Sequence, residues 1–139
     1  MIRAGTCGKW AWAHEESTSR SADPEVTRAV SAGTLALSLY HDLRSMTALT
    51  CAENGTLVTA INTWRRPPPS GHAGSRPAMF DADVTALGAD PHAPTVGTTD
   101  PVELFFGLAE TRFGVGLTHG ALLLEPVWCG AVTPDGSPS

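Results

Sequence analysis

Two histidines and one cysteine are the residues of this sequence best suited to chemistry. His14 and His41 each lie at the end of a predicted strand, and an acidic residue follows each of them. If both strands end at the same edge of a sheet, the two imidazoles meet near the Cys51 thiol. Imidazole nitrogen and thiolate sulfur are ligands that zinc prefers, and a thiolate is also a nucleophile. These three residues therefore define one hypothesis, a metal- or thiol-dependent enzyme.

The spacing of the histidine, cysteine and serine residues argues against such an enzyme. The sequence has no HExxH, HxH or CxxC pattern and no Gly-x-Ser-x-Gly turn. Cys51 lies in an alternating segment, where a cysteine usually packs as a small buried hydrophobe. We therefore expect no catalytic residue, no metal ligand and no cofactor.

Aromatic residues supply a second kind of candidate. Tryptophan and tyrosine are enriched at the energetic centres of protein interfaces. The candidates for an interaction surface are Trp10, Trp12, Tyr40, Phe105 and Trp128. A small-molecule site is the alternative, with an apolar pocket lined by the first three of these residues.

Alternation of apolar and polar residues predicts strands over residues 9–15, 34–42, 46–52, 56–63 and 126–132. Asn54-Gly55 predicts a two-residue hairpin turn, because both residues tolerate positive φ. The register that follows from this turn pairs Ala52 with Leu57, Thr50 with Thr59 and Ala48 with Ile61.

A first helix is predicted over residues 23–33. Asp23 supplies an N-cap and Pro24 suits the first helical position, where its missing N–H costs nothing. Val26, Ala29 and Val30 form an apolar stripe at helical spacing, which predicts the face that packs on the core.

A second helix is predicted over residues 100–114, again with an Asp-Pro start. Its predicted buried face consists of Val102, Phe105, Phe106, Ala109 and Phe113. We expect this helix to form the largest contact with the core, and Gly114 to end it.

These elements predict an α+β fold, a mainly antiparallel sheet of four to five strands with two principal helices on one face. The length of 139 residues fits a single domain, residues 1–132. Residues 65–80 are rich in proline and glycine and are predicted to form a mobile loop. Residues 133–139 are predicted to form a disordered tail.

Charge and composition exclude several kinds of partner. The chain has 9 Lys and Arg residues against 14 Asp and Glu residues, a net charge of −5, so no basic footprint for nucleic acid is expected. The sequence contains no run of eighteen apolar residues, so no membrane-spanning helix is predicted. Three widely spaced cysteines and the lack of an apolar signal-peptide core indicate a cytoplasmic protein with reduced thiols. A Cys7–Cys129 disulfide is the alternative.

Several short motifs together resemble a known family. They are Gly8–Glu15, Asp23–Val26, Arg28–Thr34, Ala52–Gly55, Gly88–Pro91 and Phe113–Val115. Over roughly residues 8–125 the chain resembles domain-of-unknown-function family 6461, a family of uncharacterised actinobacterial proteins. Members carry further residues before the Trp-containing strand, so the resemblance implies that this chain is an N-terminally truncated form. The family has no established activity, and the resemblance implies no site residue.

The first functional hypothesis is accordingly a small cytoplasmic, non-enzymatic module that binds a protein partner, in the manner of a regulatory or immunity-like protein. It rests on the lack of catalytic and metal-binding spacing and on the aromatic candidates. The alternatives are the enzyme that uses His14, His41 and Cys51, and the small-molecule binder. Neither a nucleic acid nor a membrane is an expected partner, and the oligomeric state is left open.

Overall fold

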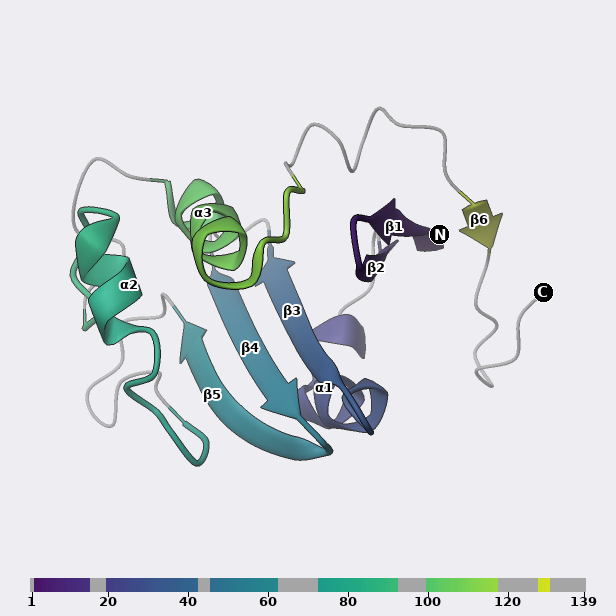
Figure 1. The fold of residues 1–139 in the computed structure, drawn as a ribbon, viewed down its shortest axis with the longest axis horizontal. Helices are drawn as coiled ribbons and strands as arrows, with labels where there is room; N and C mark the ends of the chain where they lie inside the picture. Colours follow the sequence, from purple (N-terminus) through teal and green to yellow (C-terminus); the bar gives the residue numbers. More distant parts are fainter. Residues whose placement is uncertain are drawn as a thin grey trace.

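The computed structural model describes residues 2–15, 20–42, 46–62, 73–92, 100–117 and 128–130. The described chain forms two antiparallel sheets with helices packed beside them, an α+β protein as predicted (Figure 1). Its elements in chain order are β1 (Ile2–Cys7), β2 (Trp10–Glu15), the 3-10 helix η1 (Arg20–Ala22), α1 (Pro24–Val30), β3 (Leu35–His41), β4 (Thr47–Glu53), β5 (Thr56–Asn62), α2 (Asp81–Ala86), α3 (Pro101–Phe113) and β6 (Trp128–Gly130).

The first sheet is the predicted meander β3-β4-β5, closed by the Asn54-Gly55 turn. Ala52 pairs with Leu57 as predicted, but the register shifts by one residue between Cys51 and Ala52. Val58 is the extra residue of this β-bulge, so the predicted pairings of Thr50 with Thr59 and of Ala48 with Ile61 are wrong. The shift sets Ile61 opposite Leu49, and both side chains are buried in the core.

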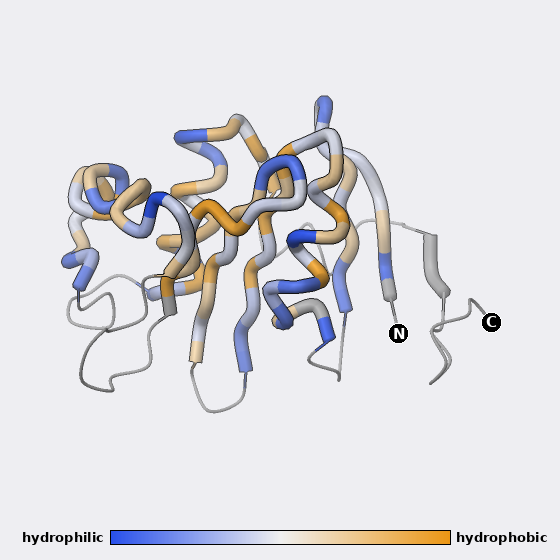
Figure 2. The backbone as a smooth tube through the Cα atoms, turned by 90° about the horizontal axis from the view of Figure 1, so that it is seen from below, coloured by the Kyte–Doolittle hydropathy of each residue, from blue (hydrophilic) through white to orange (hydrophobic). Residues whose placement is uncertain are grey.

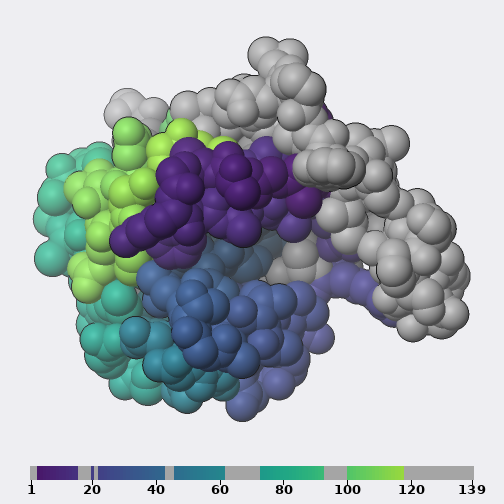
Figure 3. All heavy atoms as spheres, turned by 45° about the vertical axis from the view of Figure 1, so that its right-hand side comes forward, coloured from purple at the N-terminus to yellow at the C-terminus, as the bar shows by residue number. Residues whose placement is uncertain are grey.

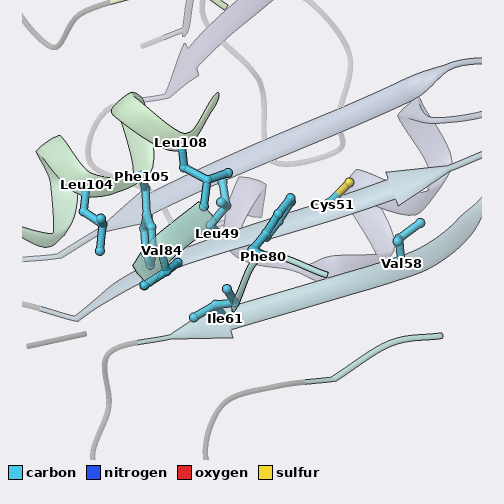
Figure 4. Close-up of a cluster of buried hydrophobic side chains, with 9 residues drawn as sticks. All are labelled: Leu49, Cys51, Val58, Ile61, Phe80, Val84, Leu104, Phe105 and Leu108. Atoms are coloured by element: carbon cyan, nitrogen blue, oxygen red, sulfur yellow. The ribbon is translucent and has the colours of Figure 1, made fainter. Parts of the chain in front are cut away.

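One face of this sheet packs against α2 and α3 and forms the hydrophobic core (Figure 4). The hydropathy colouring in Figure 2 shows apolar residues along these strands and along the helices beside them. Asp100 caps α3 by accepting the Val102 N–H at 2.9 Å, and Gly114 ends it with φ +68°, both as predicted. Its buried residues are Val102, Leu104, Phe105, Leu108 and Ala109, so Leu104 and Leu108 take the place predicted for Phe106 and Phe113.

The opposite face of the same sheet is covered by α1. Thr50 and Ala52 alternate with the core residues of β4 and are also buried, so both faces of the strand are covered. α1 contacts β3, β4 and β5, and lies at the end of the sheet where the β4–β5 turn is (Figure 1). The prediction of two principal helices on one face is therefore corrected, since α1 and α3 lie on opposite faces.

The described part of the segment predicted as a loop, residues 73–80, follows the edge of β5. Ala73 and Ala60 exchange backbone hydrogen bonds of 3.0 and 3.2 Å, and the Arg76 N–H donates to the Val58 carbonyl at 2.8 Å. This segment leads into Phe80, which is fully buried in the core before α2 begins. It covers the outer edge of β5 and carries a core side chain.

The second sheet has the order β2-β1-β6. β2 and β6 lie inside segments predicted as strands, whereas β1 was not predicted. The strands thus divide between two three-stranded sheets instead of forming one. Cys7 at the end of β1 is a free thiol, so the alternative of a Cys7–Cys129 disulfide is wrong. The predicted tail at 133–139 lies outside the described residues.

Candidate interaction surface

The structure separates the three residues of the enzyme hypothesis. His14 lies on β2 opposite Arg3, whereas His41 ends β3 and Cys51 lies within β4, in the other sheet. The His41 Nδ1 atom is 2.9 Å from the Thr47 hydroxyl. Across the described ranges, no group of three His, Cys, Asp or Glu side chains is placed to hold a metal ion. The three residues do not form a common site.

Cys51 is also unsuited to be a nucleophile. Its side chain is fully buried in the core cluster, where it lies opposite Leu37 on one side and Thr59 on the other. Burial, with a smaller contribution from the Glu53 carboxylate, raises the pKa of the Cys51 thiol to about 11. The thiol therefore stays protonated near neutral pH, and only a thiolate attacks or binds metal. Cys51 is a core residue.

The aromatic candidates fall into different environments. Phe105 is fully buried between α3 and the sheet, which confirms its predicted place on the buried face of the helix, so its prediction as an interaction candidate is wrong. The neighbouring Phe106 is the half-buried one of the pair. Trp12 and Tyr40 are half-buried on strands of different sheets, and the Trp128 side chain lies outside the described residues.

Trp10 belongs to an aromatic junction at the carboxyl end of α3. Its indole Nε1–H donates to the Phe113 carbonyl at 3.1 Å, and its ring meets the Phe113 ring edge-on with centroids 6.3 Å apart. Phe113 meets Phe80 in the same edge-on manner at 6.0 Å. The Arg112 guanidinium lies 5.6 Å from the Phe80 ring centroid and binds the Asp83 carboxylate at 2.6 Å. The junction joins β2, α2 and α3, which is a structural role.

The most unusual surface of the described chain is the outer face of α1. Val26 is 42% exposed and Val30 is 62% exposed, and these two are the large hydrophobic side chains found exposed in the described part of the chain. Ala29, which lies between them on the same face, is exposed as well. The apolar stripe predicted to pack on the core therefore faces solvent, and this prediction is wrong.

The polar stripe of α1 packs on the sheet in its place. Thr27 is 3% exposed and Ser31 is 0% exposed. The Ser31 hydroxyl accepts a hydrogen bond from the Gly55 N–H at 2.9 Å and donates to the Arg28 carbonyl at 2.8 Å. The Arg28 Nε–H donates to the Gly55 carbonyl at 3.1 Å. These bonds to the β4–β5 turn fix the rotation of α1 about its axis.

The spacing of the hydroxyl residues in α1 could have indicated this rotation of the helix, but the apolar residues have the same spacing and indicate the opposite rotation. Thr27 and Ser31 stand four residues apart, as do Val26 and Val30, so α1 has two stripes of equal length. Small side chains allow a helix to approach a strand closely, and a hydroxyl satisfies the backbone groups of a turn. The stripe that contacts the turn is therefore the one that carries hydroxyl groups, and the two valines are left outside. We refer to Val26, Ala29 and Val30 as the α1 valine face.

The described structure defines a class of protein: a small α+β protein with two antiparallel sheets and an apolar face on α1. The chain matches the model of a family of unknown function (DUF6461) over residues 2–136, and it belongs to that family. No curated protein and no solved structure matches it. Among the described residues, no helix is long and apolar enough to cross a membrane.

Proposed function

We propose that this chain is a cytoplasmic, non-enzymatic module that binds a protein partner, as a regulatory or immunity-like protein does, and that the α1 valine face is part of its contact surface. The observation that supports the proposal is the reversed orientation of α1, whose valines face solvent while Thr27 and Ser31 are buried. Burying an exposed valine stabilises a complex by up to roughly 1.5–3 kcal/mol. Aliphatic side chains exposed on a helix are therefore suited to the centre of an interface.

Three features of α1 fit a rigid contact surface. Asp23 caps its first turn by accepting the Glu25 N–H at 2.9 Å, and Arg28 binds the Glu25 carboxylate at 2.8 Å. The bonds from Ser31 and Arg28 to Gly55 anchor its other end to the sheet. A surface held in this way loses little conformational entropy when a partner binds.

The enzyme and the small-molecule binder have weaker support. The enzyme needs a reactive Cys51, and that thiol is buried and protonated. The small-molecule binder needs Trp10, Trp12 and Tyr40 around one pocket, and the first two lie in a different sheet from the third.

The test is site-specific photo-crosslinking of the full chain in cells of its source. A benzophenone side chain replaces Val30 in one variant and Ala86 in the other, since both positions are exposed on helices. We expect a discrete protein adduct from position 30 and none from position 86. Excess untagged wild-type chain should remove the adduct, whereas excess Val26→Gln/Val30→Gln chain should not.

A matched control for the competitor is Ala82→Gln/Ala86→Gln, which places the same side chains at the same spacing on exposed positions of α2. This variant should compete as well as the wild type. Equal competition by the α1 and α2 variants, or no adduct from position 30, would reject the α1 valine face as a contact surface.

A further inference from the structure

The described side chains of the β1–β2 hairpin include none that is fully buried. From Arg3 to Glu15, every residue is half-buried or exposed. The core cluster is instead formed by side chains of β4, β5, α2, α3 and Phe80. Figure 3 shows the hairpin on the surface of the molecule, where it lies against α3. The fully buried residues of the core cluster therefore all lie outside the hairpin.

Two contacts between the hairpin and the rest of the chain lie at the carboxyl end of α3. Trp10 donates its indole N–H to the Phe113 carbonyl and meets the Phe113 ring edge-on. At the other end of the β1–β2 turn, the Cys7 sulfur lies 3.9 Å from the position that a Cβ atom on Gly116 would occupy. Both contacts fall within residues 113–116, just where the helix ends.

We propose that the β1–β2 hairpin undocks from α3 as a unit while the β3-β4-β5 layer stays folded, and that Trp10 is the latch that sets this equilibrium. Undocking breaks contacts of half-buried side chains, the indole hydrogen bond and the Trp10–Phe113 ring contact among them, whereas global unfolding also exposes the core around Phe80 and Phe105. A segment with few buried apolar contacts opens at a lower free energy than the core.

Undocking has two structural consequences. A small sheet that does not pack against a helix is only marginally stable in water, even with the three residues of β6 paired to β1, so the β1–β2 hydrogen bonds open once the contact with α3 is lost. β6 pairs with β1 over Ile2–Ala4, so the last strand moves together with the hairpin. The movement uncovers the Phe113 ring, which the docked Trp10 contacts.

The first test is hydrogen exchange on the full chain, resolved by residue. We expect the amides paired between β1 and β2 to exchange at least about tenfold faster than those paired between β3 and β4. Trp10→Phe removes the indole donor and keeps an aromatic ring. It should speed exchange in the hairpin further and leave β4 unchanged. A merely structural role for Trp10 would speed exchange in both sheets equally.

The second test locks the hairpin with a disulfide. Gly116→Cys places a thiol beside Cys7, and Cys129→Ser removes a competing cysteine. On oxidation, the β1–β2 amides should slow to the rate of the β3–β4 amides, and reduction should restore the difference. The same chain with Cys7→Ser should show no effect of oxidation.

Equal acceleration of exchange in both sheets by Trp10→Phe would overturn the role of Trp10 as the latch, and two further outcomes would overturn the proposal. One is equal exchange of the hairpin and β4 in the wild-type chain, which would show that both open only in global unfolding. The other is a hairpin that still exchanges fast after Cys7 has formed its disulfide in the Gly116→Cys variant, which would show that the latch is elsewhere. If the Trp10→Phe variant does not fold, the disulfide experiment with Gly116→Cys still tests the proposal.

Discussion

The indole ring of Trp12 lies over Gly5, its partner across the β1–β2 hairpin. The two residues are directly opposite in the register, and a Cβ atom built on Gly5 would lie 2.8 Å from the Cζ2 atom of that ring. The glycine therefore provides the space that the indole occupies. A glycine covered in this way by a cross-strand aromatic residue is protected from the loss of packing that glycine usually brings to a strand.

Replacing Gly5 tests this relationship. Gly5→Ala should displace the Trp12 ring and weaken the hairpin by about 1–3 kcal/mol, the usual cost of overpacking. The measurement is hydrogen exchange of the β1–β2 amides together with a red shift of tryptophan fluorescence. Thr6→Ala, at an exposed position of the same strand, is the control and should change neither. An unshifted spectrum for Gly5→Ala would mean that the indole does not occupy this space.

Gly74 allows residues 73–76 to lie against β5. It has φ +104°, and a Cβ atom there would lie 2.5 Å from the Val58 carbonyl oxygen. Gly74→Ala should therefore lower the free energy of unfolding by about 2 kcal/mol or more, because backbone strain and a clash with backbone atoms add.

Gly88 provides a matched control for Gly74. It also has positive φ, +85°, but a Cβ atom there would meet nothing within 4 Å. Gly88→Ala should consequently show the cost of the backbone conformation alone. Urea denaturation of both variants gives the comparison, and equal losses would contradict the close approach of residue 74 to Val58.

The raised pKa of the Cys51 thiol predicts that the folded chain loses stability at alkaline pH. Its thiol pKa is raised from 9.0 to about 11 in the folded chain, so between these values the unfolded chain releases a proton that the folded chain keeps. The stabilisation is complete below pH 9 and is lost as the pH rises to about 11, by an amount on the order of 2–3 kcal/mol. The measurement is urea denaturation from pH 7 to 11.

The variant Cys51→Ala separates this thiol from the other groups that titrate in the same range. Its cavity lowers stability by a constant amount, so the difference between wild type and variant should shrink as the pH rises from 9 to 11. A difference that stays constant over this range would show that the Cys51 pKa is not raised.

The orientation of α1 predicts an unusual ranking of substitutions on one helix. Val30→Gln should change the free energy of unfolding by no more than about 0.5 kcal/mol, as surface substitutions do. Ser31→Ala should cost about 1–3 kcal/mol, because it leaves the Gly55 N–H without its acceptor. Thermal and urea denaturation rank the two variants. A larger loss for Val30→Gln would place the valines in the core, as their spacing alone predicts.

The sequence by itself determined the features that depend on neighbouring residues. Asp23 and Asp100 cap their helices, Gly114 ends α3 with positive φ, and Asn54-Gly55 forms the β4–β5 turn, all as predicted. A cap or a two-residue turn is completed by hydrogen bonds within a few residues, so its energy is decided locally.

The tertiary structure decided which faces are buried, and with them the candidate interaction surface. The valine and the hydroxyl stripes of α1 are equally spaced, and the contacts with the sheet, including the bonds to the Gly55 N–H and carbonyl, select between them. The bulge at Val58 moved Ile61 opposite Leu49 so that both reach the core. β1 became a strand by pairing on one side with β2 and on the other with β6, which is more than a hundred residues away. Burial is a property of two surfaces in contact, and a sequence pattern describes only one of them.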